Sequence, residues 1–350
     1  MSPAALANWA SLSNPERHAA ARWMARRLMA TGTFRRLGSG VVGIGFGFRE
    51  RRPKRRGGRP RYGKSVVLVV TVRKKWKAGR RGRLRAVPPK VEVRVPLGQR
   101  RILLAIPTDV CQARRPRPHA DPDACRSESM YAGEPGVEGS VAALVRNAGQ
   151  AGGPIYLLGC QHVFHRTLLT WNSAPDPTAQ VYARPAGSAL LGPATRPAPF
   201  GPRVDSVDAS LVLLTDAGLA IARKKSFWPK VATDYMKDST QLDNVTGLAW
   251  KLYSRFEPAG LSYVRTRLCK EIEYGSNSVT VRIIEVVVSR STGREPKKGD
   301  SGGAVMVGPL LVGIHIAGEG PLSYCIPAYR LFSTAAFKPK LELASDLISP

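Results

Sequence analysis

The segment Gly299-Asp-Ser-Gly-Gly303 constrains the fold of this chain more than any other feature of its sequence. Its glycines allow backbone conformations that other residues avoid, so the chain can turn sharply around Ser301. A sharp turn can direct the amides of Gly299 and Ser301 at one oxygen, and such preorganised donors stabilise negative charge that develops there. Gly, Asp and Ser are equally common in plain turns. The motif therefore predicts either a nucleophilic Ser301 or a turn between two strands.

A serine hydroxyl is a weak nucleophile unless a neighbouring base removes its proton. The sequence Ile155-Tyr-Leu-Leu-Gly-Cys-Gln-His162-Val-Phe predicts an apolar strand that runs into a short turn carrying His162. We therefore predict His162 as the general base. Two alternatives stay open: His165 takes this role if the turn has another register, or His162 is a histidine packed at the end of a strand.

The carboxylate that would orient the imidazole is predicted within residues 203–214, where two aspartates precede an apolar run. Asp208 is preferred over Asp205 because the apolar run begins directly after it. A carboxylate that accepts the second ring N–H of His162 fixes its tautomer and stabilises the imidazolium. Taken alone, each aspartate is also typical of a turn or of the start of a strand.

The order of these residues along the chain carries further information. His162, Asp208 and Ser301 follow one another as base, carboxylate and nucleophile do in chymotrypsin-fold serine peptidases, and the glycine-rich motif resembles the segment that presents the nucleophile in that family. The resemblance implies a serine endopeptidase that hydrolyses peptide bonds in proteins. In such an enzyme the amides of Gly299 and Ser301 form the oxyanion hole, and neither a cofactor nor a metal is needed.

A second, looser resemblance covers most of residues 38–335. It is to plant narrow-leaf-type serine proteases and their bacterial relatives, and it rests on the segments 41–47, 68–75, 106–110, 139–145 and 161–163. In that family a small α/β region precedes a trypsin-like domain and oligomers are usual. We therefore expect the same organisation here, with a homo-oligomer. The basic stretch at 49–64 departs from the family pattern, and no role is implied for it.

The hydrophobic pattern agrees with a mainly β chain. Amphipathic helices are expected within the first 30 residues, followed by strands near 38–48, 65–72, 91–95 and 101–106, and by two clusters of short strands after residue 136. Two such clusters suit a chymotrypsin-like double β-barrel. We expect a helical segment at 1–37, a small basic α/β domain at 38–111, a linker at 112–135 and the protease domain at 136–350.

Positive charge is concentrated in the first part of the chain. The net charge is +29, and residues 1–125 hold 30 Lys and Arg against 6 Asp and Glu. Two runs stand out, 49–64 and 73–85. Such density attracts nucleic acid or another polyanion, so residues 49–85 are a predicted contact site. Solvated loops and tails also carry blocks of like charge, which leaves a plain loop as the alternative.

The strand after the nucleophile segment contains Val312-Gly-Ile-His315-Ile-Ala-Gly318. This resembles the arrangement in glutamyl endopeptidases and viral 3C-type proteases, which implies that His315 and Gly318 line the primary specificity pocket. An imidazole N–H there can donate to an acidic or amide side chain, which predicts Glu, Gln or Asp before the cleaved bond. Arg294, Lys297 or Lys298 are further candidates for positive charge. The alternative is an ordinary buried His315 bonded to a neighbouring hydroxyl.

The remaining signals concern the environment of the chain. No stretch approaches the length and apolarity of a membrane span or a secretory signal. The 5 cysteines are odd in number and contain no CxxC pair, so neither zinc ligands nor a disulfide framework is indicated. We expect a reducing, cytoplasmic setting.

Two function classes therefore compete. One is the serine endopeptidase, which could release its own basic region by cutting after Glu138, whereas Pro135 should protect the bond after Glu134. The other is a polyanion-binding protein that keeps a protease fold as a scaffold. The two combine in a protease controlled by an anionic ligand.

Overall fold

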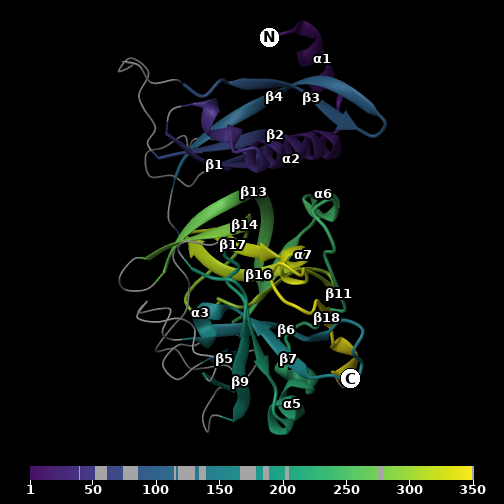
Figure 1. Ribbon diagram of the computed structural model, residues 1–350, viewed down its shortest axis with the longest axis vertical. Helices are drawn as coiled ribbons and strands as arrows, with labels where there is room; N and C mark the ends of the chain where they lie inside the picture. Colours follow the sequence, from purple (N-terminus) through teal and green to yellow (C-terminus); the bar gives the residue numbers. More distant parts are fainter. Residues whose placement is uncertain are drawn as a thin grey trace. The chain divides into compact units, whose positions relative to one another are not determined.

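The computed structural model describes residues 1–38, 40–51, 61–73, 86–113, 116, 131–133, 139–165, 179–183, 189–201, 205–254, 256–274 and 279–348 (Figure 1). The chain divides into two compact units. Unit 1 contains residues 1–114 and 264–270, and unit 2 contains residues 115–263 and 271–350. The mainly β character and the N-terminal helices confirm the expected fold class at this level. The basic residues 52–60 and 74–85, Cys125, Glu134 and Glu138 lie outside the described residues.

Unit 1 begins with helices α1 (Pro3–Ser11) and α2 (Asn14–Ala30), followed by the 3-10 turn η1 (Thr33–Leu37). A capping box starts α2, because Ser13 and Glu16 each bond the other's backbone N–H. Along α2, Ala21, Met24, Ala25 and Leu28 recur at intervals of three and four and are buried. This spacing gives the helix one apolar face.

In the part of unit 1 that the structure describes, the sheet has four strands of its own and part of a fifth. These are β1 (Val41–Arg51), β2 (Arg61–Val72), β3 (Lys90–Leu97), β4 (Arg100–Gln112) and residues 264–270 of β13 (Ala259–Tyr274). Their order is β13-β1-β2-β4-β3, with β2 and β4 parallel and the other pairs antiparallel. Helix α2 lies along β1 and β2 and closes an apolar core with Ile44, Phe46, Leu68, Val70, Leu104 and Ile106 (Figure 1).

The alternating glycines of β1 have a structural cause. A Cβ on Gly45 would lie 2.2 Å from the carbonyl oxygen of Thr266, and a Cβ on Gly47 would lie 2.4 Å from the Cα of Arg265. Strand β13 can therefore approach β1 only where β1 has no side chain.

Charged residues lie on the opposite face of this sheet from the apolar core. The Arg265 side chain is 1% exposed and pairs loosely with Glu50 at 3.5 Å and Asp109 at 3.8 Å. Its guanidinium also lies over the ring of Tyr62. A buried positive charge needs a partner of opposite charge, and on this face the two carboxylates provide it.

Unit 2 contains two groups of strands. The first comprises β5 (Tyr131–Gly133), β6 (Gly139–Asn147), β7 (Ile155–Gly159), β8 (Gln180–Ala183), β9 (Leu190–Pro197), β10 (Ser210–Leu213) and β18 (Leu341–Leu343). Their order is β18-β6-β5-β8-β9-β10-β7, and β7 also pairs with β6.

The second group comprises β11 (Asp234–Tyr235), β12 (Trp250–Tyr253), the unit 2 parts of β13, β14 (Val279–Ser291), β15 (Ala304–Val307), β16 (Leu310–Glu319) and β17 (Leu322–Pro327). The order is β12-β15-β16-β17-β14-β13, and β12 also pairs with β13. Short helices occupy the connections: α3 (Gln161–Phe164), α5 (Asp216–Ala222), η2 (Lys225–Phe227), α6 (Gln241–Val245), α7 (Ala328–Leu331) and η3 (Ser345–Leu347). Among the described helices, none has the length and apolarity to span a bilayer.

Candidate active site

Strand pairing brings His162 and Asp208 to one place. Strands β7 and β10 are antiparallel, with Gly159 opposite Ser210. His162 follows the end of β7 in helix α3, and Asp208 precedes the start of β10, so both lie at the same end of this strand pair. The Phe164 ring packs closely on Gly159 at the end of β7, because a Cβ on Gly159 would lie 2.5 Å from that ring.

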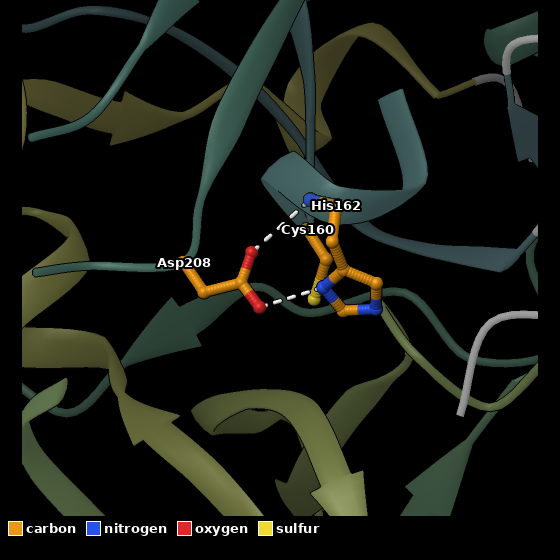
Figure 2. Close-up of side chains that lie close together, drawn as sticks. All are labelled: Cys160, His162 and Asp208. Carbon is orange, nitrogen blue, oxygen red and sulfur yellow. Dashed lines mark hydrogen bonds and ion pairs between the residues drawn. The ribbon is translucent and has the colours of Figure 1, made fainter. Parts of the chain in front are cut away.

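His162 and Asp208 form a buried hydrogen-bonded pair. The His162 Nδ1 atom lies 2.6 Å from Asp208 Oδ2, and the His162 backbone N–H donates to Asp208 Oδ1 at 3.2 Å (Figure 2). Both side chains are fully shielded from solvent. The carboxylate thus holds the residue at its backbone and at its ring. An ionised carboxylate can only accept, so Nδ1 carries the proton of this hydrogen bond.

The two alternatives from the sequence have other partners. Asp205 pairs with Arg282, and both side chains are about half exposed. His165 is buried, and its Nε2 lies 3.2 Å from the Ser210 hydroxyl.

Tyr274 is a member of this cluster that the sequence did not indicate. Its hydroxyl donates to Asp208 Oδ2 at 2.7 Å, and its ring meets the His162 ring edge-on at 5.7 Å. Burial, followed by the charge of Asp208, raises the pKa of Tyr274 well above its usual value, so the hydroxyl stays protonated. Tyr274 ends a long strand far from any short motif, and no local pattern marks it.

Cys160 is the other unforeseen neighbour. Its Sγ donates to the backbone oxygen of His315 at 3.2 Å, and burial together with Asp208 raises the pKa of this thiol well above its usual value. Cys160, His162 and Asp208 place three potential metal ligands within 4.8 Å (Figure 2). Within this cluster the histidine and the carboxylate bond to each other.

The Ser301 segment forms a tight, glycine-dependent turn. Gly299 and Gly302 have φ of 89° and 88°, and a Cβ on Gly302 would lie 1.8 Å from the Ser140 backbone oxygen. Ser140 holds the turn from one side, because its N–H donates to Ser301 O at 2.7 Å and its hydroxyl to Gly299 O at 2.9 Å. From the other side, Gly302 N–H donates to His315 O at 2.8 Å.

A buried ion pair anchors the same turn. Arg294 donates to both Asp300 oxygens, at 2.7 Å and 2.9 Å, and the Ser254 hydroxyl and the Lys297 N–H add further hydrogen bonds to that carboxylate. Burial alone would raise the pKa of Asp300, but the hydrogen bonds and the charge of Arg294 oppose this effect, and the pKa is lowered. Arg294 is therefore engaged by the turn itself, and Lys297 lies over the Phe256 ring.

Gly139 relates the Ser301 turn to the His162 helix. A Cβ built on Gly139 would lie 2.6 Å from Ser301 O and 2.7 Å from a methyl of Val163, so both segments pack on this one residue. The Ser301 hydroxyl itself donates to Ile316 O at 3.4 Å. Among the described residues, His162 Nε2 has no hydrogen-bond partner. The structure therefore places the two segments against a common neighbour without a hydrogen bond between the Ser301 hydroxyl and the imidazole.

His315 lies buried in β16, with Nδ1 2.8 Å from the Ser323 hydroxyl of β17. An ordinary buried histidine bonded to a neighbouring hydroxyl was the alternative reading of His315, and Ser323 is such a hydroxyl. The same hydrogen bond fixes the orientation of the His315 ring. Gly318 is opposite Ser323 in the same strand pair. The structure thus brings His315 and Gly318 onto one strand beside the Ser301 turn.

No protein-family model and no curated protein matches the chain. Solved structures that it matches include a glutamic acid specific serine protease that uses a histidine triad in substrate binding, with 16% identity, a TM-score of 0.38, and coverage of 59% of this chain and 96% of that one. Another is the NS6 protease of murine norovirus 1, with 12% identity, a TM-score of 0.26, and coverage of 49% and 80%. These matches are all to proteases, at low identity and with TM-scores below 0.5.

Proposed function

We propose that the chain is a serine endopeptidase in which Ser301, His162 and Asp208 form the catalytic triad. The observation that carries this proposal is the buried hydrogen bond between His162 and Asp208, formed next to the glycine-flanked turn that presents Ser301. The pairings of β6 with β7 and of β12 with β13 further support two barrels in unit 2.

In the proposed reaction, Ser301 Oγ forms a bond to the carbonyl carbon of the scissile peptide while His162 Nε2 takes its proton. Asp208 stabilises the imidazolium, and the amides of Gly299 and Ser301 stabilise the oxyanion. The imidazolium then gives its proton to the leaving amine as the C–N bond breaks. Water repeats these steps on the acyl-enzyme, releasing the acid and restoring Ser301. For the first step the Ser301 hydroxyl leaves Ile316 O and turns to His162, since catalytic hydrogen bonds often tighten only with substrate bound.

We further propose a preference for Glu, Gln or Asp before the cleaved bond. The support is the fixed orientation of His315, because a hydroxyl that donates to Nδ1 leaves Nε2 protonated and able to donate to a carboxylate or an amide oxygen. A pocket built around a hydrogen bond rejects side chains that cannot make it. Buried His315 also has its backbone bonded to the Ser301 turn, which ties the recognition residue to the nucleophile.

A peptide library digested with the purified protein and read by mass spectrometry tests both proposals. Cleavage after Glu, Gln or Asp that disappears in the Ser301→Ala variant is expected. Cleavage after Lys, Arg or Leu would discard the preference while leaving the peptidase. Absence of any cleavage that depends on Ser301 would count against the peptidase.

The charge of residues 1–125 favours a second role, the binding of nucleic acid or another polyanion by residues 49–85. Gel retention at increasing salt tests it, with a strong loss of binding as salt rises expected. A chain that retains no nucleic acid even at low salt would exclude this role. The cytoplasmic setting and the homo-oligomer stay predictions.

A further inference from the structure

We propose that Tyr274 is a positioning residue of the active site, which holds the Asp208 carboxylate in place for His162. This inference rests on the proposed peptidase function and adds a fourth side chain to the triad. It starts from one atom, Asp208 Oδ2, which accepts from the Tyr274 hydroxyl at 2.7 Å and from His162 at 2.6 Å. All three side chains are fully buried.

Two hydrogen bonds on one carboxylate oxygen compete for the same charge. A donor to Oδ2 draws electron density from it, which weakens its pull on the His162 N–H and stabilises the buried charge. Tyr274 can act as this donor at every working pH, because burial and the charge of Asp208 raise its pKa well above the usual value. The tyrosine therefore alters the strength of the Asp208–His162 hydrogen bond, and through it the basicity of the imidazole, without contacting the substrate.

Packing on two sides holds the Tyr274 ring in place. Its ring meets His162 edge-on at 5.7 Å and Phe200 at 5.0 Å, so the hydroxyl is directed at Asp208 by packing on two sides. Groups that face His162 in this pocket are Asp208, Tyr274 and the Cys160 thiol, and burial keeps that thiol protonated. Asp208 is accordingly the carboxylate partner of the imidazole.

The Tyr274→Phe variant keeps the ring and removes only the hydroxyl. We expect kcat to fall about 10-fold to 100-fold with KM nearly unchanged, as for the loss of a hydrogen bond to a charged group. The acid limb of the kcat/KM profile should move to higher pH, because Oδ2 regains charge and stabilises the imidazolium more strongly. An unchanged kcat with an unchanged acid limb would overturn the inference.

Tyr329→Phe is the matched control, since it also removes a tyrosine hydroxyl from a buried carboxylate of unit 2. Tyr329 donates to Glu285 at 2.5 Å, and Glu285 is held in addition by Arg330. We expect this control to leave the acid limb unmoved. An equal displacement in both variants would show a general effect of lost tyrosine hydroxyls and overturn the specific role.

A readout that needs no turnover separates this inference from the proposed function. The His162 Nδ1 proton should give a far-downfield proton resonance, assigned by its loss in His162→Ala. It should shift in Tyr274→Phe and shift the opposite way when 3-fluorotyrosine, a stronger donor, replaces Tyr274. The fluorotyrosine protein also serves if Tyr274→Phe does not fold. A resonance that stays in place in the folded variants overturns the inference even if the wild type is an active peptidase, whereas inactive wild type with shifting resonances refutes only the peptidase.

Discussion

Arg294 grips Asp300 with two parallel hydrogen bonds, 2.7 Å and 2.9 Å long, directly before the proposed nucleophile Ser301. The carboxylate is fully buried, while the guanidinium is partly exposed. Paired forks of this kind combine charge with fixed geometry. The conformation of the Ser301 turn therefore depends on an arginine five residues before Gly299.

Replacing this arginine should be costly, because it leaves a buried carboxylate without its partner. We expect Arg294→Met to lower the free energy of unfolding by about 3–5 kcal/mol, measured by urea denaturation. Arg146→Met is the matched control, since Arg146 also contacts two carboxylates, but those of Glu342 and Asp346 are 35% and 56% exposed. For Arg146→Met we expect the free energy of unfolding to fall by about 1 kcal/mol or less. Equal losses in the two variants would contradict the anchoring role.

The same ion pair predicts a dependence of stability on pH. The pKa of Asp300 is lowered in the folded protein, whereas in the unfolded chain it is about 3.9. The unfolded state therefore binds the proton first, so the stabilisation is complete above pH 3.9 and is lost as pH falls through the lowered value. Between pH 5 and pH 2, the wild type should lose stability more steeply than Arg294→Met. Parallel curves would contradict this assignment.

Much of this arrangement follows from local sequence patterns. Alternating apolar residues and glycine punctuation predicted a mainly β chain with N-terminal helices, and these patterns act over a few residues. The Ser301 turn could be predicted because the glycines at positive φ lie within the turn itself and form a short sequence motif. The proximity of His162 and Asp208 needed only the pairing of two neighbouring strands.

Other features could not be read from the sequence because they depend on distant partners. Tyr274 reaches Asp208 across 66 positions, and a tyrosine at the end of a strand looks the same whether or not it has a carboxylate partner. Arg294 was a candidate for substrate charge, yet the fold uses it for Asp300. The glycines of β1 likewise depend on a distant partner, because residues 264–267 of β13 lie against Gly45 and Gly47.

Those glycines lead to a third prediction. Gly45→Ala would place a Cβ 2.2 Å from Thr266 O, which forces β1 and β13 apart. We expect a loss of about 1–3 kcal/mol in the stability of unit 1, the usual cost of overpacking. Gly63→Ala in β2 is the control, because its Cβ meets only the flexible end of Arg51 at 3.0 Å. Equal stability of the two variants in thermal unfolding would disagree with this explanation.

The cysteines should differ in reactivity. Burial raises the pKa of the Cys111 thiol, but Arg267, Arg265 and the Thr71 hydroxyl outweigh burial and lower it below its usual value. Burial raises the pKa of Cys325 to about 12. Since the thiolate is the reactive form, iodoacetamide at pH 7.5 should modify Cys111 before Cys325, as followed by peptide mass spectrometry. Arg267→Leu should slow the modification of Cys111. Faster modification of Cys325 than of Cys111 in the wild type would argue against this charge environment.

The most direct test of the proposed triad is covalent labelling of the native protein by a fluorophosphonate, with the modified residue identified by mass spectrometry. We predict one label, on Ser301, that is absent in Ser301→Ala and strongly slowed in His162→Ala, with both variants folded. A wild-type protein that takes no label at Ser301, or that is labelled at the same rate without His162, would contradict the account.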